Sequence, residues 1–499
     1  MHNSFMRVRI VPLKSGKRAL QVVSKRLGKL TVHKHLGTFT TEEQKQSLWE
    51  KAKKYIKCQT GQEDLFAPSE YLQLKNVVIT QSRLLFLYRL LCRIYTYIGL
   101  DKCEDSLIRD LIVARIYQPS SKRETQEVLA DLFGINYSLI TIYRHLKKAI
   151  SKNLKDQFQA ALIHFAQKGL KDSLRLVFYD VTTLAFDSQM RKGLKDFGFS
   201  KDHRFQDIQI VVGLVVNQQG FPLYFDVFSG KTFEGNTFVL VVEKIKELLN
   251  NPDLVVIADA AMVSRLNVEE MDKRKIGFIV GARLANLPIK LQEQISQEVL
   301  DQDLKTTTVN YLGHRLICQY VSQRAAKDKS DREKQIAKAE ETVSSPTRIT
   351  RRFRFVQAVN GKYAINSTLI EKAKRLEGIK GYLTNTNLGE ITVIDRYHDL
   401  WRIEKAFRLT KTDLEARPIF MRLDETITCH LIIVFAGLAI CRFMEIQTNM
   451  SIQRILKIAQ KVLTHQVINS QTGEKALIET TILDEELKQK IELLNSLGH

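Results

Sequence analysis

The chain has 499 residues, a length that predicts about three domains. Hydrophobic residues make up 44% of it, which is enough for large cores and argues against global disorder. The formal net charge of +21 is unevenly distributed. Residues 1–170 hold 29 Lys and Arg against 14 Asp and Glu, a net of +15, whereas residues 171–499 hold 47 against 41, a net of +6. This excess of positive charge favours nucleic acid or another anionic surface as the partner.

The cysteines and the apolar runs argue against a secreted or membrane-bound protein. Six cysteines lie at positions 58, 92, 103, 318, 429 and 441, with no C-x-x-C pair and no zinc-type spacing. We expect reduced, buried thiols in a cytosolic protein without a signal peptide. The most apolar run, Leu431–Cys441, is too short to span a bilayer, so it predicts a buried helix and no membrane partner.

Residues 1–70 are predicted to form a small basic module. Met6–Pro12 and Ala19–Ser24 have the composition of strands and flank a Lys-Ser-Gly-Lys turn. Thr41–Lys57 is typical of a helix, with a threonine as N-cap and acids in the first turn. The pattern therefore predicts a β/α module.

Residues 71–169 are predicted to form a helical DNA-binding domain, in which residues 76–166 are helical throughout. Three helices are expected at Leu107–Tyr117, Arg123–Phe133 and Leu139–Ile150, with Gly134 ending the second. Two helices joined by a Gly-containing turn indicate a helix-turn-helix. The candidate DNA-binding residues of its last helix are Tyr143, Arg144, Lys147 and Lys148. The alternative is an ordinary helical hairpin whose second helix is basic.

From residue 170 the pattern changes to mixed α/β. Leu174–Tyr179 and Leu254–Ala258 are apolar and predict buried strands, followed directly by Asp180 and Asp259. Between them a hairpin is expected from two further strands, Asp207–Asn217 and Phe221–Phe228. The carboxyl ends of buried strands are where α/β sheets place their sites. An Asp in this position also commonly caps the next turn, which is the structural alternative.

Residues 285–390 combine β-like runs with one charged helix. The runs are Thr306–Tyr311, Arg315–Val321 and Arg352–Val359, and the helix is Ala325–Thr342. A basic strand edge that includes Arg351 and Arg352 is a candidate DNA contact. A solvated edge protected against aggregation is the alternative.

The stretch Tyr397–Lys411 has no Gly or Pro and predicts one helix with two stripes. At 100° per residue, one stripe carries a single acid among aromatic and cationic residues: Tyr397, Trp401, Glu404, Arg408 and Lys411. The neighbouring stripe is apolar and anchors the helix in a core: Leu400, Ile403, Phe407 and Leu414. Such an acid suits a metal-binding carboxylate beside a nucleic-acid backbone. The alternative is an amphipathic helix with intrahelical ion pairs.

Together, Asp180, Asp259 and Glu404 are candidate catalytic residues and metal ligands. Three carboxylates from separate segments can hold two divalent cations, which activate an attacking oxygen and stabilise the leaving oxygen of a phosphodiester. Mg²⁺ suits such ligands, and Mn²⁺ is expected to substitute. Tyr397, Arg402, Arg408 and Lys411 are predicted to contact DNA, while Trp401 either stacks on an unpaired base or packs in the core.

These residues and their surroundings resemble the DDE transposases of bacterial insertion sequences, in the subgroup with a Tyr-x2-Arg-x3-Glu-x6-Lys signature. The segments that carry the resemblance are YDVTTLAFD, GFSKD, GLVVNQQGFPLYFDVFSGKTFEGNT, VIADAAMVS and IEKAFRLTKTDLEARPIFMR. The chain departs from the family at Leu400, where the signature has Arg, and at Ala260, where an Arg often follows the second Asp. Both differences affect positions expected to bind the DNA ends, and neither removes a metal ligand.

The resemblance implies an α/β multidomain protein with a ribonuclease H-like catalytic core. The interval of 145 positions from Asp259 to Glu404 exceeds what such a core needs, so a β-containing insertion is expected. The predicted parts are the module 1–70, the helical region 71–169, the core 170–284 and 391–450, the insertion 285–390 and a helical C-terminal region 451–499.

The implied activity is metal-dependent cleavage at terminal inverted repeats followed by strand transfer of these mobile-element ends. The partners implied are double-stranded DNA, as transposon ends and as target, and a second copy of the chain in the DNA complex. Two alternatives remain: a ribonuclease H-like nuclease without strand transfer, and a catalytically inactive DNA-binding protein derived from a transposase.

Overall fold

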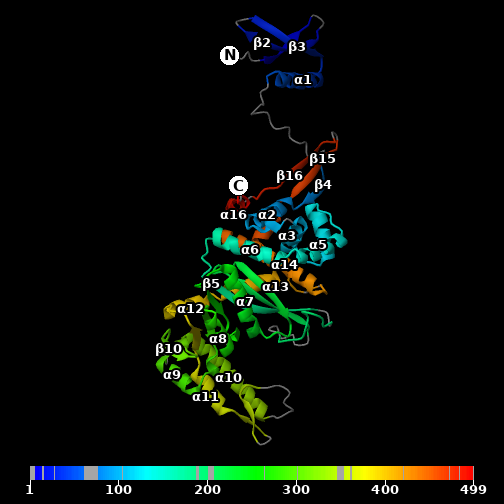
Figure 1. Cartoon of the computed structure of the whole chain (residues 1–499). Helices are drawn as coiled ribbons and strands as arrows, with labels where there is room; N and C mark the ends of the chain where they lie inside the picture. Colours follow the sequence, from blue (N-terminus) through cyan, green and yellow to red (C-terminus); the bar gives the residue numbers. More distant parts are fainter. Residues whose placement is uncertain are drawn as a thin grey trace. The chain divides into compact units, whose positions relative to one another are not determined.

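The computed structural model describes residues 6–13, 16–26, 29–60, 77–103, 105–186, 190–199, 207–262, 264–299, 302–344, 353–359, 362–417, 419, 421–470, 473–482 and 484–497. The chain divides into two compact units (Figure 1). The smaller comprises Met1–Ile79 with Val467–Lys475, and the larger comprises Thr80–Gln466 with Ala476–His499. The six-part division expected from the sequence is finer than this and stays a prediction.

The smaller unit contains a three-stranded antiparallel sheet packed against one helix. Its elements are β1 (Met6–Pro12), β2 (Arg18–Arg26), β3 (Lys29–Phe39) and α1 (Glu42–Thr60), and β2 is the central strand. Leu20, Val22, Phe39 and Ala52 form its buried core. The predicted β1, β2 and α1 are confirmed, whereas β3 was not predicted, because its alternating Lys and His residues hide the strand pattern.

The helical region of the larger unit follows the sequence-based expectation from Leu85 onward. Its elements are α2 (Leu85–Tyr97), η2 (Leu100–Cys103), α3 (Ser106–Tyr117), α4 (Lys122–Val128), the π-helical turn η3 (Leu129–Phe133), α5 (Leu139–Ser151) and α6 (Leu154–Lys168). Side chains of Asp105, Ser121 and Ser138 accept backbone N–H groups at the starts of α3, α4 and α5. Gly134 ends the second predicted helix at φ 75°, as expected.

Two predictions of continuous helix are wrong at the edges of this region. β4 (Val77–Arg83) is a strand, because its β-branched residues suit a sheet. The C-terminal region contains helices α15 (Ile452–Ala459) and α16 (Glu485–Asn495), but also strands β15 (Thr464–Asn469) and β16 (Lys475–Glu479). These strands form a sheet in the order β16-β15-β4, so pairing between distant segments decided their conformation.

An eight-stranded mixed sheet organises the larger unit, in the order β10-β11-β14-β9-β8-β5-β6-β7. Five of its strands form the predicted catalytic core: β5 (Leu176–Ala185), β6 (Gln209–Val216), β7 (Pro222–Ser229), β8 (Val255–Ala258) and β9 (Gly277–Ala282). β5, β6 and β7 are antiparallel, while β8 and β9 run parallel to β5. This arrangement of a mixed sheet with helices confirms the predicted mixed α/β fold.

The predicted insertion contributes three strands to the same sheet. Its elements are η5 (Leu284–Asn286), α9 (Ile289–Val299), β10 (Thr306–Tyr311), β11 (His314–Tyr320), α10 (Ser322–Ser344), β12 (Val356–Val359), β13 (Lys362–Ile365), α11 (Ser367–Arg375) and β14 (Ile379–Thr384). β14 pairs antiparallel with β9, and β11 with β14. The strands of the predicted core and of the predicted insertion therefore form one sheet, continuous through main-chain hydrogen bonds.

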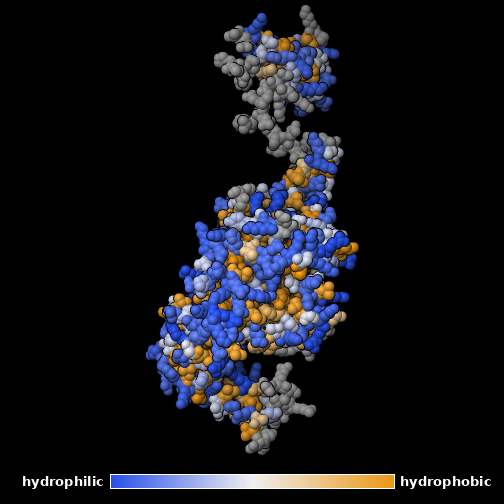
Figure 2. Space-filling model, viewed as in Figure 1, coloured by the Kyte–Doolittle hydropathy of each residue, from blue (hydrophilic) through white to orange (hydrophobic). Residues whose placement is uncertain are grey.

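Helices of the core include α7 (Glu234–Leu249), η4 (Ala260–Met262), α8 (Arg265–Lys273), α12 (Glu390–His398), α13 (Trp401–Thr412) and α14 (Asp424–Thr448). α14 is the one helix in the described part of the chain that is long and apolar enough to cross a membrane, but it lies in the protein interior. It contains the predicted buried run Leu431–Cys441, and this prediction is confirmed. On the face shown in Figure 2, the larger unit is mainly hydrophilic, with hydrophobic residues scattered among the polar ones.

Candidate active site

Asp180 and Asp259 are brought together by two parallel strands. β5 and β8 pair in a register that sets Tyr179 opposite Ala258, and the next residue on each segment is an acid. Asp259 follows the last residue of β8, as predicted. The expectation that the first strand ends at Asp180 is wrong, since β5 continues to Ala185. Its later residues pair with β6, which places Asp180 in the middle of the strand.

Glu404 lies near the start of α13, and the predicted single helix from Tyr397 to Lys411 is wrong. α12 ends at His398 and α13 begins at Trp401. Between them the N–H of Leu400 donates to the carbonyl of Tyr397 at 3.1 Å, an i→i−3 bond that tightens the chain. Neither Gly nor Pro marks this break, so the residue types alone did not reveal it.

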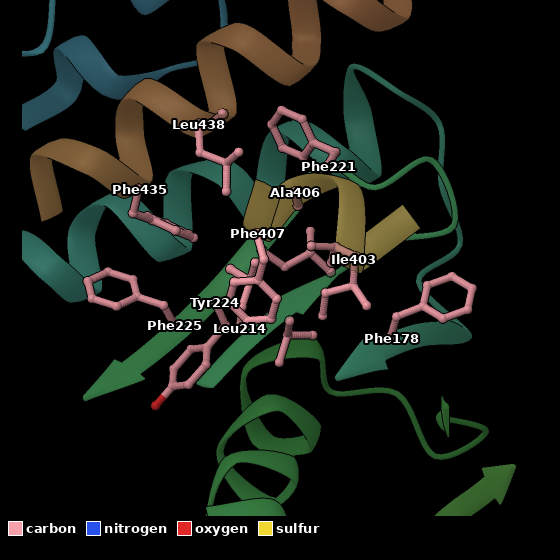
Figure 3. Close-up of a cluster of buried hydrophobic side chains, with 14 of the residues drawn as sticks. Phe178, Leu214, Phe221, Tyr224, Phe225, Ile403, Ala406, Phe407, Phe435 and Leu438 are labelled. Atoms are coloured by element: carbon pink, nitrogen blue, oxygen red, sulfur yellow. The ribbon is translucent and has the colours of Figure 1, made fainter. Parts of the chain in front are cut away.

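The apolar side of α13 fixes the direction in which Glu404 points. Ile403, Ala406 and Phe407 are buried between the sheet and α14, next to Phe178, Leu214 and Phe435 (Figure 3). Glu404 and Arg408 are exposed on the other side of the helix. The predicted apolar stripe is therefore confirmed as an anchor, and it orients the polar stripe of α13.

One cavity of about 1110 Å³ brings the three predicted acids together. Asp180, Asp259 and Glu404 all line it. Tyr397 and Trp401 line it as well, whereas Arg402, Arg408 and Lys411 are not among its lining residues. Trp401 is 51% exposed, which argues against the alternative that it packs in the core.

Arg402 is engaged locally on α13. Its Nε donates to Oδ1 of Asp399 at 3.1 Å, and its guanidinium lies 5.0 Å from the centre of the Trp401 ring. This pair holds the start of α13 to the turn before it. A role of Arg402 in DNA binding stays a prediction.

Tyr397 links α12 to the second acid. Its hydroxyl donates a long hydrogen bond of 3.5 Å to Oδ1 of Asp259. Burial raises the pKa of Tyr397, and the negative charge of Asp259 raises it further, so the phenol stays protonated and able to donate at neutral pH. Oδ1 of Asp259 also accepts the N–H of Ala260 at 2.6 Å. These two donors orient the Asp259 carboxylate.

Lys380 is a residue of this site that the sequence analysis missed. It is the half-buried member of β14, whose other residues are buried, and it lines the cavity with the acids. Its Nζ lies 4.6 Å from the centre of the Tyr397 ring. Burial lowers the pKa of Lys380, with a further decrease from Arg324, while Asp259 and Glu404 stabilise its charged form. A lysine within an otherwise apolar strand is the signal that would have revealed it.

The insertion supplies the opposite wall of the cavity. Its helices α10 and α11 and the turn after α11 place both signs of charge there: Arg324, Asp328, Asp331, Arg332, Lys372 and Glu377. Arg332 of α10 forms an ion pair with Glu377, which lies in the turn after α11. The sequence indicated the charged helix α10 but not that it would face the acids, because this depends on β14 pairing with β9.

The carboxylates suit Mg²⁺ in their chemistry, since hard oxygen donors are its preferred ligands. Asp180 and Asp259 occupy neighbouring strand positions, and Glu404 lines the same cavity. Within the described residues, however, no three His, Cys, Asp or Glu side chains are grouped closely enough to hold a metal ion. The three acids therefore fit a divalent cation by ligand type and by their shared cavity, while in this structure they are spaced more widely than one bound ion requires.

The other predicted DNA contacts lie outside this cavity. Tyr143, Arg144, Lys147 and Lys148 are exposed on α5, while Ile142, Leu146 and Ala149 bury its other side. This face is free to meet a ligand, and its DNA contact stays a prediction. Arg351 and Arg352 lie outside the described residues.

Comparisons with known proteins identify a family for this chain. The family model described as a transposase DDE domain matches residues 175–440, more than half of the chain. Among solved structures, the chain is similar to the piggyBac transposase synaptic complex with hairpin DNA, with 8% sequence identity and a TM-score of 0.37. That similarity covers 75% of this chain and 70% of the other. No curated protein matches the chain.

Proposed function

The chain belongs to the family of transposases with a DDE domain, and we propose that it cleaves DNA at the terminal inverted repeats of a mobile element and joins the ends to target DNA. The observation that carries the proposal is the position of Asp180, Asp259 and Glu404 on one cavity. They come from β5, the end of β8 and α13, and no shared local structure would require three acids there.

The roles proposed for the residues follow from their contacts. Asp180, Asp259 and Glu404 would hold Mg²⁺, which when bound supplies activation of the attacking oxygen and stabilisation of the leaving oxygen. Tyr397 orients Asp259 through its hydroxyl. Lys380 neutralises part of the negative charge of the acids and presents a cation to a phosphate in the cavity. Trp401 offers an exposed aromatic face to a DNA base.

The test is cleavage of a plasmid that carries the DNA flanking the gene, with Mg²⁺ and with EDTA. Asp180→Ala, Asp259→Ala and Glu404→Ala should each reduce cleavage to the background level and leave DNA binding intact, because metal ligands act mainly on the transition state. EDTA should do the same to the wild type. Nicking at the wild-type rate by one of the three variants would remove that residue from the site.

A matched control is Asp331→Ala. Asp331 is an exposed acid that lines the same cavity from α10, so its removal changes the local charge equally without touching the proposed ligands. Its cleavage rate should stay within about twofold of the wild type, as for surface substitutions away from a reacting centre. Joining of a cleaved end to a second plasmid would distinguish a transposase from a nuclease without strand transfer. Binding without metal-dependent nicking would indicate an inactive derivative.

A further inference from the structure

The sheet of the smaller unit has two different faces. Met6 and Val8 of β1 pack with the core against α1. Because side chains alternate along a strand, Arg7 and Arg9 point to the opposite face, and both are exposed. That face, here called the open face, is covered by no helix of the unit within the described residues.

Strand register places one row of polar and cationic side chains across the open face, beside a second row in which Arg7 lies opposite Val23. Arg9 lies opposite Gln21, which in turn lies opposite His35. Nε2 of Gln21 and Nδ1 of His35 are 3.4 Å apart, so these side chains lie on the same side of the sheet. Lys25 borders the face and lines a shallow hollow with Arg7 and Arg9. A continuous set of hydrogen-bond donors therefore crosses all three strands.

The charge of this unit is concentrated in its sheet. Residues 6–41 contain nine Lys and Arg and not one Asp or Glu. The first 60 residues hold 14 cations against three acids, a net of +11 out of the +21 of the whole chain. The three acids, Glu42, Glu43 and Glu50, all lie on α1. A purely cationic sheet with the acids on its helix has the charge pattern of a polyanion-binding surface.

We propose that the open face of β1, β2 and β3 docks in the major groove of duplex DNA. Strands about 4.8 Å apart make a three-stranded sheet about 10 Å wide between its outer strands, and the major groove is about 12 Å wide. Arg and Gln are the side chains that read guanine and adenine edges in that groove. The proposed transposase activity names DNA as the partner, but this docking needs no cleavage and can fail independently of it.

The experiment compares two double variants of the full chain that remove the same charge. Arg7→Gln with Arg9→Gln changes the open face, and Lys51→Gln with Lys53→Gln changes exposed positions on α1. Glutamine retains part of the side-chain stem, which matters because Val23, opposite Arg7, is fully buried. Binding of a 30-base-pair duplex of arbitrary sequence is measured by fluorescence anisotropy over a range of salt concentrations, with EDTA present.

We expect the open-face variant to bind at least tenfold more weakly at low salt. Its slope of log K against log salt should decrease by up to about 2, since each lost phosphate contact contributes about 0.9. The α1 variant should keep the wild-type slope. Equal losses in both variants, or no loss in either, would overturn the proposal and leave the cleavage site untouched.

Two further measurements keep the result interpretable. If the open face enters the groove, Gln21→Ala should weaken DNA binding severalfold, because it removes a side chain that contacts the bases. The salt slope should stay unchanged, because the substitution removes no charge. Lys25→Gln replaces the double variant if that variant melts earlier than the wild type. Binding of single-stranded DNA or of phosphatidylserine vesicles as tightly as duplex, with the same dependence on Arg7 and Arg9, would overturn duplex docking in favour of that ligand.

Discussion

The two sheets around which the units are built display opposite chemistry. The central sheet places Asp180 on β5 and Asp259 directly after the adjacent strand β8, among strands whose other residues are largely buried. The sheet of the smaller unit buries one side against α1 and exposes arginine and lysine on the other, without one acid in its strands. In these two sheets, the two carboxylates lie among buried strand residues, whereas the cations lie on an exposed face.

This difference follows from the two proposed roles, which are metal binding by the acids and phosphate binding by the cations. Residues proposed to hold a metal must keep their geometry, and Asp180, Asp259 and Glu404 lie on or next to buried strands and on a helix anchored by Ile403 and Phe407. Residues that meet phosphates act through charge over several ångströms and tolerate motion of long side chains. Variants of the central sheet should therefore alter cleavage, and variants of the open face should alter the salt dependence of binding.

The largest expected effect is from Phe407→Ala. Phe407 anchors α13 between the sheet and α14 (Figure 3), and truncation of a buried Phe costs about 3–5 kcal/mol. Unfolding by urea should show this loss, and cleavage should fall because Glu404 is no longer held. Phe39→Ala is the matched change in the smaller core, and it should reduce the salt slope of binding while cleavage at saturating DNA persists. If Phe407→Ala reduced the salt slope of DNA binding and left cleavage unchanged, the assignment of cleavage to the central sheet and of DNA binding to the smaller unit would be wrong.

The next effect concerns Asp226 at the edge of the central sheet. Its carboxylate accepts hydrogen bonds from Lys155 of α6 at 2.6 Å and Lys244 of α7 at 2.9 Å. Burial acts to raise the pKa of Asp226, but the two lysines outweigh it and hold the pKa below its ordinary value of 3.8. Asp226→Asn should lower stability at pH 7 by about 1.5–3 kcal/mol, as for charged hydrogen bonds.

The sign of the pH dependence follows from the lowered pKa of Asp226. A carboxylate with a depressed pKa in the folded state stabilises the protein fully above pH 3.8, and this contribution is lost as the pH falls below that value. Chemical denaturation of the wild type and of Asp226→Asn should therefore give a difference in the free energy of unfolding that is constant between pH 5 and 7. This difference should disappear in stronger acid. A difference in unfolding free energy that increased in acid would contradict the ion pairs of Asp226 with the two lysines.

A smaller effect is expected from Tyr397→Phe, which removes one hydroxyl and leaves the ring. The variant loses the hydrogen bond to Asp259, and cleavage should slow about tenfold, equivalent to about 1.4 kcal/mol in the barrier. The melting temperature and the salt slope should match those of the wild type. Unchanged cleavage would show that Asp259 needs no orientation by Tyr397.

The smallest effect is expected from Lys411→Ala. Lys411 lies near the end of α13, two turns after Glu404, and is not among the residues that line the cavity. If it contacts DNA, binding should weaken about two- to fivefold, the salt slope should become shallower by about 0.9, and melting without DNA should stay the same. Earlier melting with an unchanged slope would make Lys411 a structural residue.

Residue types and their spacing were enough to identify the acids, the core strands and the basic N-terminal module. Asp180 and Asp259 each follow an apolar run, and such runs form buried strands largely irrespective of their partners. The apolar stripe of α13 could likewise be predicted, because it depends only on helical periodicity.

Tertiary structure alone decided the rest. The continuation of β5 past Asp180, the strand β4 and the place of Lys380 all depend on pairing with segments far away in the sequence. The break between α12 and α13 came without Gly or Pro, so it reflects packing rather than local preference. Local composition cannot report such features, because their free energy comes from contacts that form only when distant segments meet.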